Sequence, residues 1–96
     1  MPKGYWIASV TVNDPENYNQ YIAAAKPVFE RFGARALVRG GAYEAVEGTA
    51  RDRNVVLEFE SLEQARACYY SPEYQDAAKI RQASSDSHLL IIEGVE

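Results

Sequence analysis

Arg81 is the residue whose position most clearly suggests chemistry. In the segment "SPEYQDAAKIR", helical spacing puts Arg81 on the arc that also carries Tyr74, Ala77 and Ala78, where an apolar side chain is expected. A guanidinium stays charged, so a buried one needs a carboxylate, several carbonyls or a bound anion. Two interpretations follow. Arg81 lines a cavity and binds an anionic or carbonyl group, or its stem packs while its head reaches solvent or a glutamate at the helix end.

Tyrosine is the second signal, because the chain contains seven of them in 96 residues. A tyrosine has an apolar body and a polar tip, which suits both the edge of a core and the wall of a pocket. Ordinary packing explains each tyrosine alone, whereas together they could line an aromatic pocket. The candidate ligand-binding residues are Tyr18, Arg39, Arg53, Tyr74 and Arg81.

Two further residues are weak candidates for acid–base catalysis, Glu58 and His88. If both lay side by side under a covered sheet face, their pKa values would be perturbed and they could exchange protons with a substrate. The alternative is that Glu58 pairs with an arginine while His88 sits exposed at the start of a strand. Strand register cannot be read from the sequence, so the catalytic residues stay unknown.

Alternating and β-branched segments predict the strands that must position these side chains. In the first, Trp6, Ala8 and Val10 point to one face of the sheet. The segment 43–48 is expected to be a short extended piece after the Gly40-Gly41 bend. The predicted strands are residues 5–12, 34–39, 55–60 and 88–95.

Capping residues predict where the helices begin. Asp14-Pro15 starts a helix that ends near Gly33. Ser61 and Gln64 form a capping box that opens a short second helix, and Ser71-Pro72 restarts it to about Gln82. Residues 83–87 are expected to be a loop.

The resulting order βαββαβ is the ferredoxin-like α+β motif, with a four-stranded antiparallel sheet and the helices on one face. We expect residues 1–96 to form a single domain. The first and last strands carry apolar residues on both sides, so the bare sheet face needs a cover. A second copy in a two-fold homodimer is the expected cover.

Composition argues against several classes of function. The net charge of −4 does not suit nucleic-acid binding. The sequence has neither a membrane-spanning apolar run nor a signal-peptide pattern, so a cytoplasmic protein is expected. One cysteine and one histidine leave no basis for a disulfide, a cysteine-based zinc site or a histidine-rich metal site. We expect no metal and no cofactor.

Several segments together resemble one family of small bacterial proteins. They are "GYWIASVTVNDPENYNQY", "VRGGAYEAVEG", "RNVVLEFESLEQA", "YYSPEYQDAAKIRQA" and "LLIIEGV". They resemble the domain of unknown function thirteen-thirty family of the dimeric α+β barrel superfamily. The resemblance implies a ferredoxin-like homodimer and no established reaction. It singles out Tyr18, Tyr21, Arg39, Gly40, Gly41, Glu47, Gly48, Arg53, Glu58, Phe59, Ser71, Tyr74 and Arg81, while Ala34 and Cys68 depart from the pattern.

Three hypotheses for function follow. The leading one is a homodimeric domain that binds a small anionic or carbonyl-bearing molecule between helices and sheet, through Tyr18, Arg53, Tyr74 and Arg81. The second is a cofactor-free isomerase or monooxygenase-like enzyme, by analogy of fold. The third is a structural or regulatory dimer without a ligand.

Overall fold

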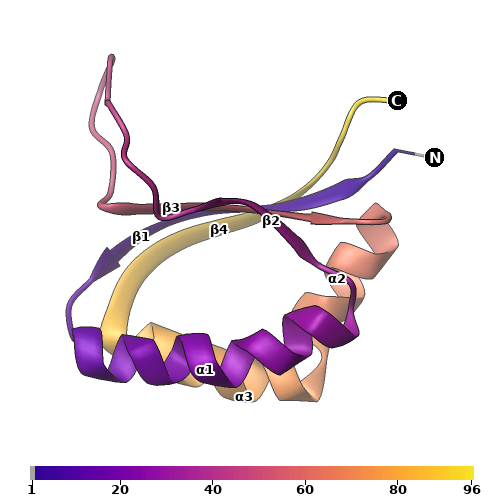
Figure 1. The fold of residues 1–96 in the computed structure, drawn as a ribbon, viewed down its shortest axis with the longest axis horizontal. Coiled ribbons are helices and arrows are strands. Elements are labelled where there is room, and N and C mark those ends of the chain that lie inside the picture. The colour runs from indigo at the N-terminus through magenta and orange to yellow at the C-terminus, as the bar shows by residue number, and fades with distance from the viewer. Residues whose placement is uncertain (1) are drawn as a thin grey trace.

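A computed structural model describes residues 2–96 and confirms the ferredoxin-like α+β fold. The elements are β1 (Gly4–Val12), α1 (Pro15–Arg31), β2 (Arg35–Arg39), β3 (Arg53–Phe59), α2 (Leu62–Tyr70), α3 (Pro72–Ser84) and β4 (Ser85–Glu93). The strand order is β2-β3-β1-β4 with antiparallel pairing, and the helices cover one face of the sheet (Figure 1). In residues 2–96, every helix is too short or too polar to cross a membrane.

The helix starts lie where the capping residues predict them. The Asp14 side chain accepts a hydrogen bond from the Asn17 backbone N–H at 3.3 Å. Ser71 Oγ accepts from the Tyr74 N–H at 3.2 Å and donates to the Cys68 carbonyl at 2.8 Å. One serine therefore ends α2 and begins α3, which fixes the position of Tyr74 relative to the sheet.

The structure confirms only one of the two hydrogen bonds of the capping box predicted at Ser61. Ser61 Oγ accepts from the Gln64 N–H at 3.1 Å, as predicted. The Gln64 side chain does not return to Ser61; it donates to the Phe32 carbonyl at 3.1 Å and ties α2 to the end of α1.

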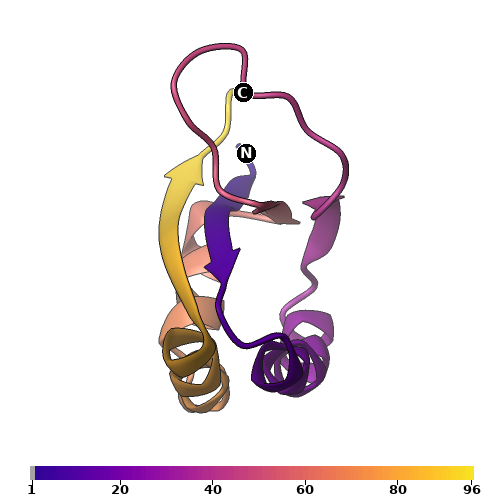
Figure 2. The ribbon, with the colours of Figure 1, turned by 90° about the vertical axis from the view of Figure 1, so that its left-hand side faces the viewer.

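Two predicted segments are wrong. Residues 43–48 are not extended in the sheet; they belong to a loop, residues 40–52, that rises from the side opposite the helices (Figures 1 and 2). The expected loop at 83–87 is absent from the described chain, because β4 begins at Ser85 directly after α3. Ser84 Oγ donates to the Ile80 carbonyl at 2.7 Å and Ser85 Oγ to the Arg81 carbonyl at 2.6 Å. These bonds satisfy two carbonyls of the last helical turn, and the Ser84 carbonyl accepts from the N–H groups of Asn13 and Asp14, so the chain can enter β4 without extra residues.

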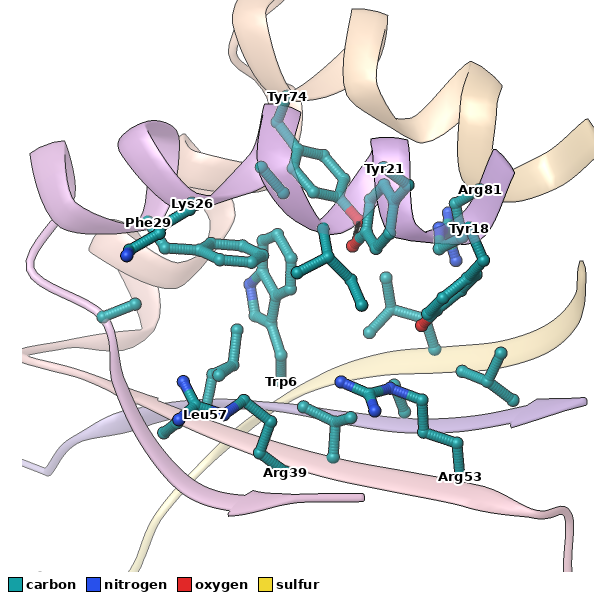
Figure 3. A pocket seen from close by; sticks show the side chains of 18 of the residues that line it. Trp6, Tyr18, Tyr21, Lys26, Phe29, Arg39, Arg53, Leu57, Tyr74 and Arg81 are labelled. Carbon is teal, nitrogen blue, oxygen red and sulfur yellow. Dashed lines mark hydrogen bonds between the residues drawn. The ribbon is translucent and has the colours of Figure 1, made fainter. Parts of the chain in front are cut away.

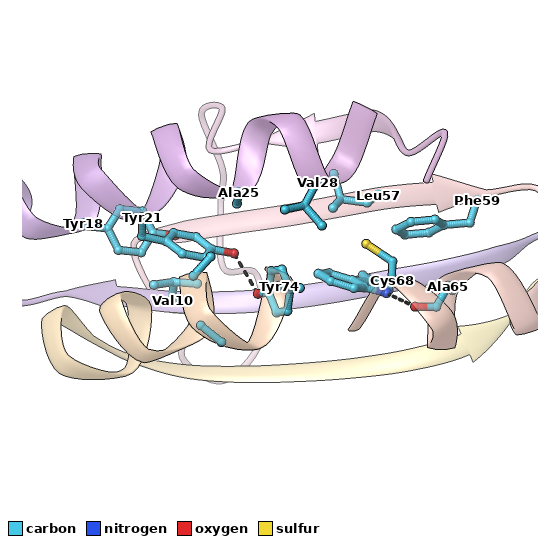
Figure 4. Close-up of a cluster of buried hydrophobic side chains, with 13 residues drawn as sticks. Val10, Tyr18, Tyr21, Ala25, Val28, Leu57, Phe59, Ala65, Cys68 and Tyr74 are labelled. Atoms are coloured by element: carbon cyan, nitrogen blue, oxygen red, sulfur yellow. Dashed lines mark hydrogen bonds between the residues drawn. The ribbon is translucent and has the colours of Figure 1, made fainter. Parts of the chain in front are cut away.

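The core lies between the sheet and the helices (Figure 4). Trp6 is at its centre, with its ring against those of Phe29, Phe59 and Tyr74 at centroid distances of 5.4, 5.4 and 4.8 Å. Trp6 Nε1 donates to the Ala65 carbonyl at 2.8 Å, so its one polar atom is satisfied although it is buried.

The opposite sheet face carries a continuous apolar row. The strand registers place Val56 opposite both Val38 and Ile7, and Ile7 opposite Leu90. These side chains thus cross all four strands of the described sheet. Ile7, Val38 and Leu90 are 41%, 43% and 50% exposed.

Candidate ligand-binding site

A cavity of about 260 Å³ lies between the inner face of the sheet, α1 and α3 (Figure 3). Its walls are largely aromatic and aliphatic side chains, including Trp6, Val10 and Leu57. The exposed residues among its lining, such as Lys26 and Arg39, mark the side that opens to solvent between α1 and β2. A concave, mostly apolar site with a few polar groups is typical of small-molecule binding.

Arg81 lines this cavity from α3 and is only 6% exposed. Its Nη1 donates to Ser87 Oγ at 2.9 Å. Its Nε is buried and has no hydrogen-bond partner in the part of the chain that the structure describes. Within residues 2–96 no carboxylate comes within ion-pair distance of it. The guanidinium is therefore buried as a charge that the described protein does not neutralise, a costly arrangement.

Arg53 enters the same cavity from the start of β3. Its Cζ lies 5.6 Å from the ring centroid of Tyr18, a cation–π contact that orients the side chain. Its Nε is also buried without a partner among residues 2–96. Figure 3 shows Arg53 and Arg81 on the two sides of Tyr18, one from the sheet and one from α3.

Gly40 makes the position of Arg53 possible. Its φ is +69°, in the left-handed region that favours glycine, and its N–H donates to the Asn54 carbonyl at 2.9 Å. A Cβ at Gly40 would lie 2.7 Å from Arg53 Nη1. The sequence identified Gly40 as a bend but gave no sign that Arg53 packs over it.

A β-bulge turns Arg39 toward the cavity. The pairing of β2 with β3 shifts between Ala36 and Val38, so Arg39 stands opposite Val55, whose side chain faces the helices. Without the extra residue, strict alternation would put Arg39 on the outer face. The bulge thereby brings Arg39 to the same cavity as Arg53.

Tyr74 and Tyr21 meet at the centre of the cavity, with their hydroxyl oxygens 2.8 Å apart. Burial, as the largest cause, raises the pKa of Tyr74 and raises that of Tyr21 well above its usual value. The positive charge of Arg81 acts in the opposite direction on both pKa values. Both hydroxyls are therefore protonated at neutral pH. Tyr21 was not among the candidate site residues, although the family resemblance singled it out.

The structure does not bring Glu58 and His88 together. Both are on the outer face, but Glu58 is opposite Tyr5 on one side of β1 and His88 is opposite Ser9 on the other side, at positions roughly 13 Å apart along β1. Glu58 accepts from the Tyr5 hydroxyl at 2.9 Å and lies 3.8 Å from Arg35. His88 is exposed, with Nε2 3.5 Å from Arg51. Neither lines the cavity, so a shared acid–base role there has no geometric support.

Cys68 is a buried residue of α2 and is not among the residues that line the cavity. Burial raises the pKa of its thiol to about 12, so it stays protonated and is a poor nucleophile.

The family comparison agrees with the motifs. A family model described as a domain of unknown function (DUF1330) matches residues 3–95. The chain belongs to the DUF1330 family. No functionally curated protein was found that matches the sequence.

Solved structures show that this DUF1330 chain shares its fold with proteins of several descriptions. One is the RPA0582 protein of unknown function from Rhodopseudomonas palustris, 23% identical with a TM-score of 0.80, covering 99% of this chain and 84% of that one. Another is SnoaB, a cofactor-independent oxygenase from Streptomyces nogalater, 16% identical with a TM-score of 0.68, covering 100% and 96%. A third is a dimeric ferredoxin-like protein of unknown function from Thermobifida fusca, 19% identical with a TM-score of 0.65, covering 96% and 91%.

Proposed function

We propose that the cavity binds a small molecule through an anionic or carbonyl oxygen, with Arg81 as the main anchor. The observation that carries this proposal is the buried Arg81 guanidinium with no carboxylate partner in residues 2–96. A ligand anion would supply the missing partner, and such charge-assisted hydrogen bonds are among the strong ones in proteins.

The charges around the cavity point the same way. Arg39, Arg53, Arg81 and Lys26 line it, whereas Glu30 is the acidic side chain among the lining residues. This local excess of positive charge occurs in a chain whose net charge is −4. The size of about 260 Å³ is just below the usual range of sites for drug-sized molecules, ~300–1,000 Å³, so the ligand is expected to be small.

A comparison of acids with their neutral amides tests this proposal. Benzoate and cyclohexanecarboxylate should raise the melting temperature of the wild type, whereas benzamide and cyclohexanecarboxamide should not. Arg81→Met should weaken acid binding about tenfold or more, the effect of losing a hydrogen bond to a charged group. Arg66→Met removes an exposed arginine on α2 and serves as the matched control. Equal binding of acids and amides, or of acids to wild type and Arg81→Met, would refute the anchor.

We also propose that the outer sheet face forms a homodimer. The supporting observation is the apolar row of Val38, Val56, Ile7 and Leu90 across the strands. Sedimentation should then give about twice the chain mass of 10.7 kDa. Ile7→Lys should produce monomers, while Ala24→Lys, on an exposed helical position, should not. A wild-type monomer at micromolar concentration would contradict the dimer.

An enzymatic function is the second candidate. It is supported by the two tyrosine hydroxyls and Arg81, which could stabilise a negatively charged oxygen during a reaction. A cofactor-free isomerase or oxygenase also requires a group that removes a proton, and the carboxylate among the cavity-lining residues is the exposed Glu30. Oxygen uptake and proton exchange into deuterated water, measured on compounds that bind, would separate catalysis from binding alone.

A further inference from the structure

We infer that the ligand of this cavity is a planar conjugated oxyanion, a phenolate or an enolate, whose oxygen accepts hydrogen bonds from the Tyr21–Tyr74 pair and from Arg81. This inference rests on the proposed binding function and adds the chemical class of the ligand. It also assigns a role to Tyr21, which is not needed for binding by Arg81 alone.

A count of protons in the tyrosine pair supplies the first step. Two hydroxyl groups hold two protons, and the 2.8 Å contact between the oxygens of Tyr21 and Tyr74 uses one of them. The other O–H is left to donate. The two tyrosines are 8% and 0% exposed, so bulk water has little access to that donor. Both line the cavity, and a ligand oxygen there would satisfy it.

The protonation of the Tyr21–Tyr74 pair and the charge of Arg81 determine which kind of ligand atom they bind. Since burial keeps both hydroxyls protonated, the pair is a donor at neutral pH and not a base. Arg81 lines the same cavity as both tyrosines, and its buried Nε is a donor with no partner in residues 2–96. A single acceptor oxygen with negative charge would suit the tyrosine donor and the guanidinium together.

The rest of the cavity selects for a flat apolar framework. Trp6, Phe29 and Tyr18 contribute aromatic surface, and Val10, Val55 and Leu57 contribute aliphatic surface. A compact polyanion such as inorganic phosphate would need donors around all of its oxygens and would be poorly solvated by these walls. A phenolate or enolate spreads its charge into a planar carbon framework that can pack against aromatic rings.

The probe 4-nitrophenol tests this inference directly, because its phenolate absorbs in the visible and its phenol form does not. Titration of the bound probe against pH in the wild type should show ionisation at a lower pH than for the free probe. In Tyr21→Phe/Tyr74→Phe, affinity for the phenolate should fall about 10- to 100-fold, while affinity for the neutral phenol changes little. Tyr70→Phe, on the exposed side of α2 at 64% exposure, is the matched control.

The possible results distinguish a wrong ligand class from a wrong binding function. If carboxylates bind through Arg81 but 4-nitrophenol binds in its neutral form, or not at all at millimolar concentration, the ligand class is wrong and the anion site stands. If the double variant holds the phenolate as tightly as the wild type does, the tyrosine pair has no role in recognition. If neither the carboxylates nor the probe bind, both the inference and the binding function fail. The wild-type titration needs no variant, so a folding defect cannot obscure the result.

Discussion

The two ends of the layer between sheet and helices are built differently. At the end next to α2, the space is filled by Phe59 and by Ala65 and Cys68 of α2 itself. Trp6 borders both ends, and its indole N–H is bonded to the Ala65 carbonyl. At the end between α1 and α3, the same sheet leaves a cavity of about 260 Å³. The polar atoms there include two guanidinium nitrogens that have no partner in residues 2–96.

This difference shows that the cavity is not simply loose packing. A cavity left by poor packing would be lined by apolar atoms, as dry cavities in proteins are. Here the buried Arg81, the half-buried Arg53 and two tyrosine hydroxyls point into the space, so the cost of burying polar atoms is concentrated at one end. Of the three buried side-chain atoms without a hydrogen bond in residues 2–96, two line this cavity, and the third, on Glu73, is in an ion pair with Arg31. Unsatisfied polar groups gathered at one place are typical of functional sites.

The largest expected effect on stability is at the packed end. Phe59 is 1% exposed, so Phe59→Ala should lower the free energy of unfolding by about 3–5 kcal/mol. Leu89→Ala, at a half-buried position that already borders the cavity, should cost about 2 kcal/mol, the low end for such truncations. Urea denaturation of both variants measures the difference. Equal losses would mean that the cavity end is packed as tightly as the other.

High pH should lower the free energy of unfolding through buried groups at both ends of this layer. The folded-state pKa of Cys68, about 12, lies above the ordinary thiol value of 9.0, and burial raises the pKa of Tyr21 and Tyr74 above 10.0. At a pH below the ordinary pKa values, burial of the neutral side chains contributes fully to the free energy of unfolding. This contribution is lost as the pH rises from the ordinary pKa toward the raised pKa of the folded state. Stability measured by urea should decline from about pH 9 upward, and less steeply in Cys68→Ala. An identical slope in that variant would contradict the assignment for Cys68.

Two glycines offer a matched test of how Arg53 is held. Gly40 and Gly48 have φ values of +69° and +74°, so alanine at either should cost roughly 1–2 kcal/mol in backbone strain. Only at Gly40 does the new Cβ meet Arg53, at 2.7 Å, whereas at Gly48 nothing lies within 4 Å. Gly40→Ala should therefore weaken binding of benzoate in calorimetry, and Gly48→Ala should not. The same affinity in both variants would mean that Arg53 can move without consequence for the site.

Much of this fold could be predicted because the signals are local. Trp6, Ala8 and Val10 occupy every second position of one strand, which puts them on one face. Asp14 and Ser71 cap helices through bonds within three residues. The same local spacing placed Arg81 on the buried arc of its helix. These features depend on neighbours in the sequence, so one chain is enough to read them.

The features that could not be predicted depend on distant contacts. The face of Arg39 is set by a bulge that exists only through the pairing of β2 with β3. The separation of Glu58 from His88 is set by two registers that meet on β1. Likewise, only the folded chain shows that Tyr21 and Tyr74, far apart in sequence, share a hydrogen bond at the centre of the cavity. The sequence thus indicated which residue types to consider but not which of them meet.

The smallest expected effect on stability, and the most informative, is at Arg81. Because its guanidinium has one hydrogen bond, to Ser87, and no ion pair within residues 2–96, its burial is not offset as that of a structural arginine would be. Replacing such a charge by an apolar side chain of similar length is often neutral or stabilising. Arg81→Met should therefore leave the melting temperature unchanged or raise it, while acid binding weakens about tenfold or more. A loss of about 3–5 kcal/mol, the cost of breaking a buried pair, would show instead that Arg81 holds the fold together and that the cavity is not its purpose.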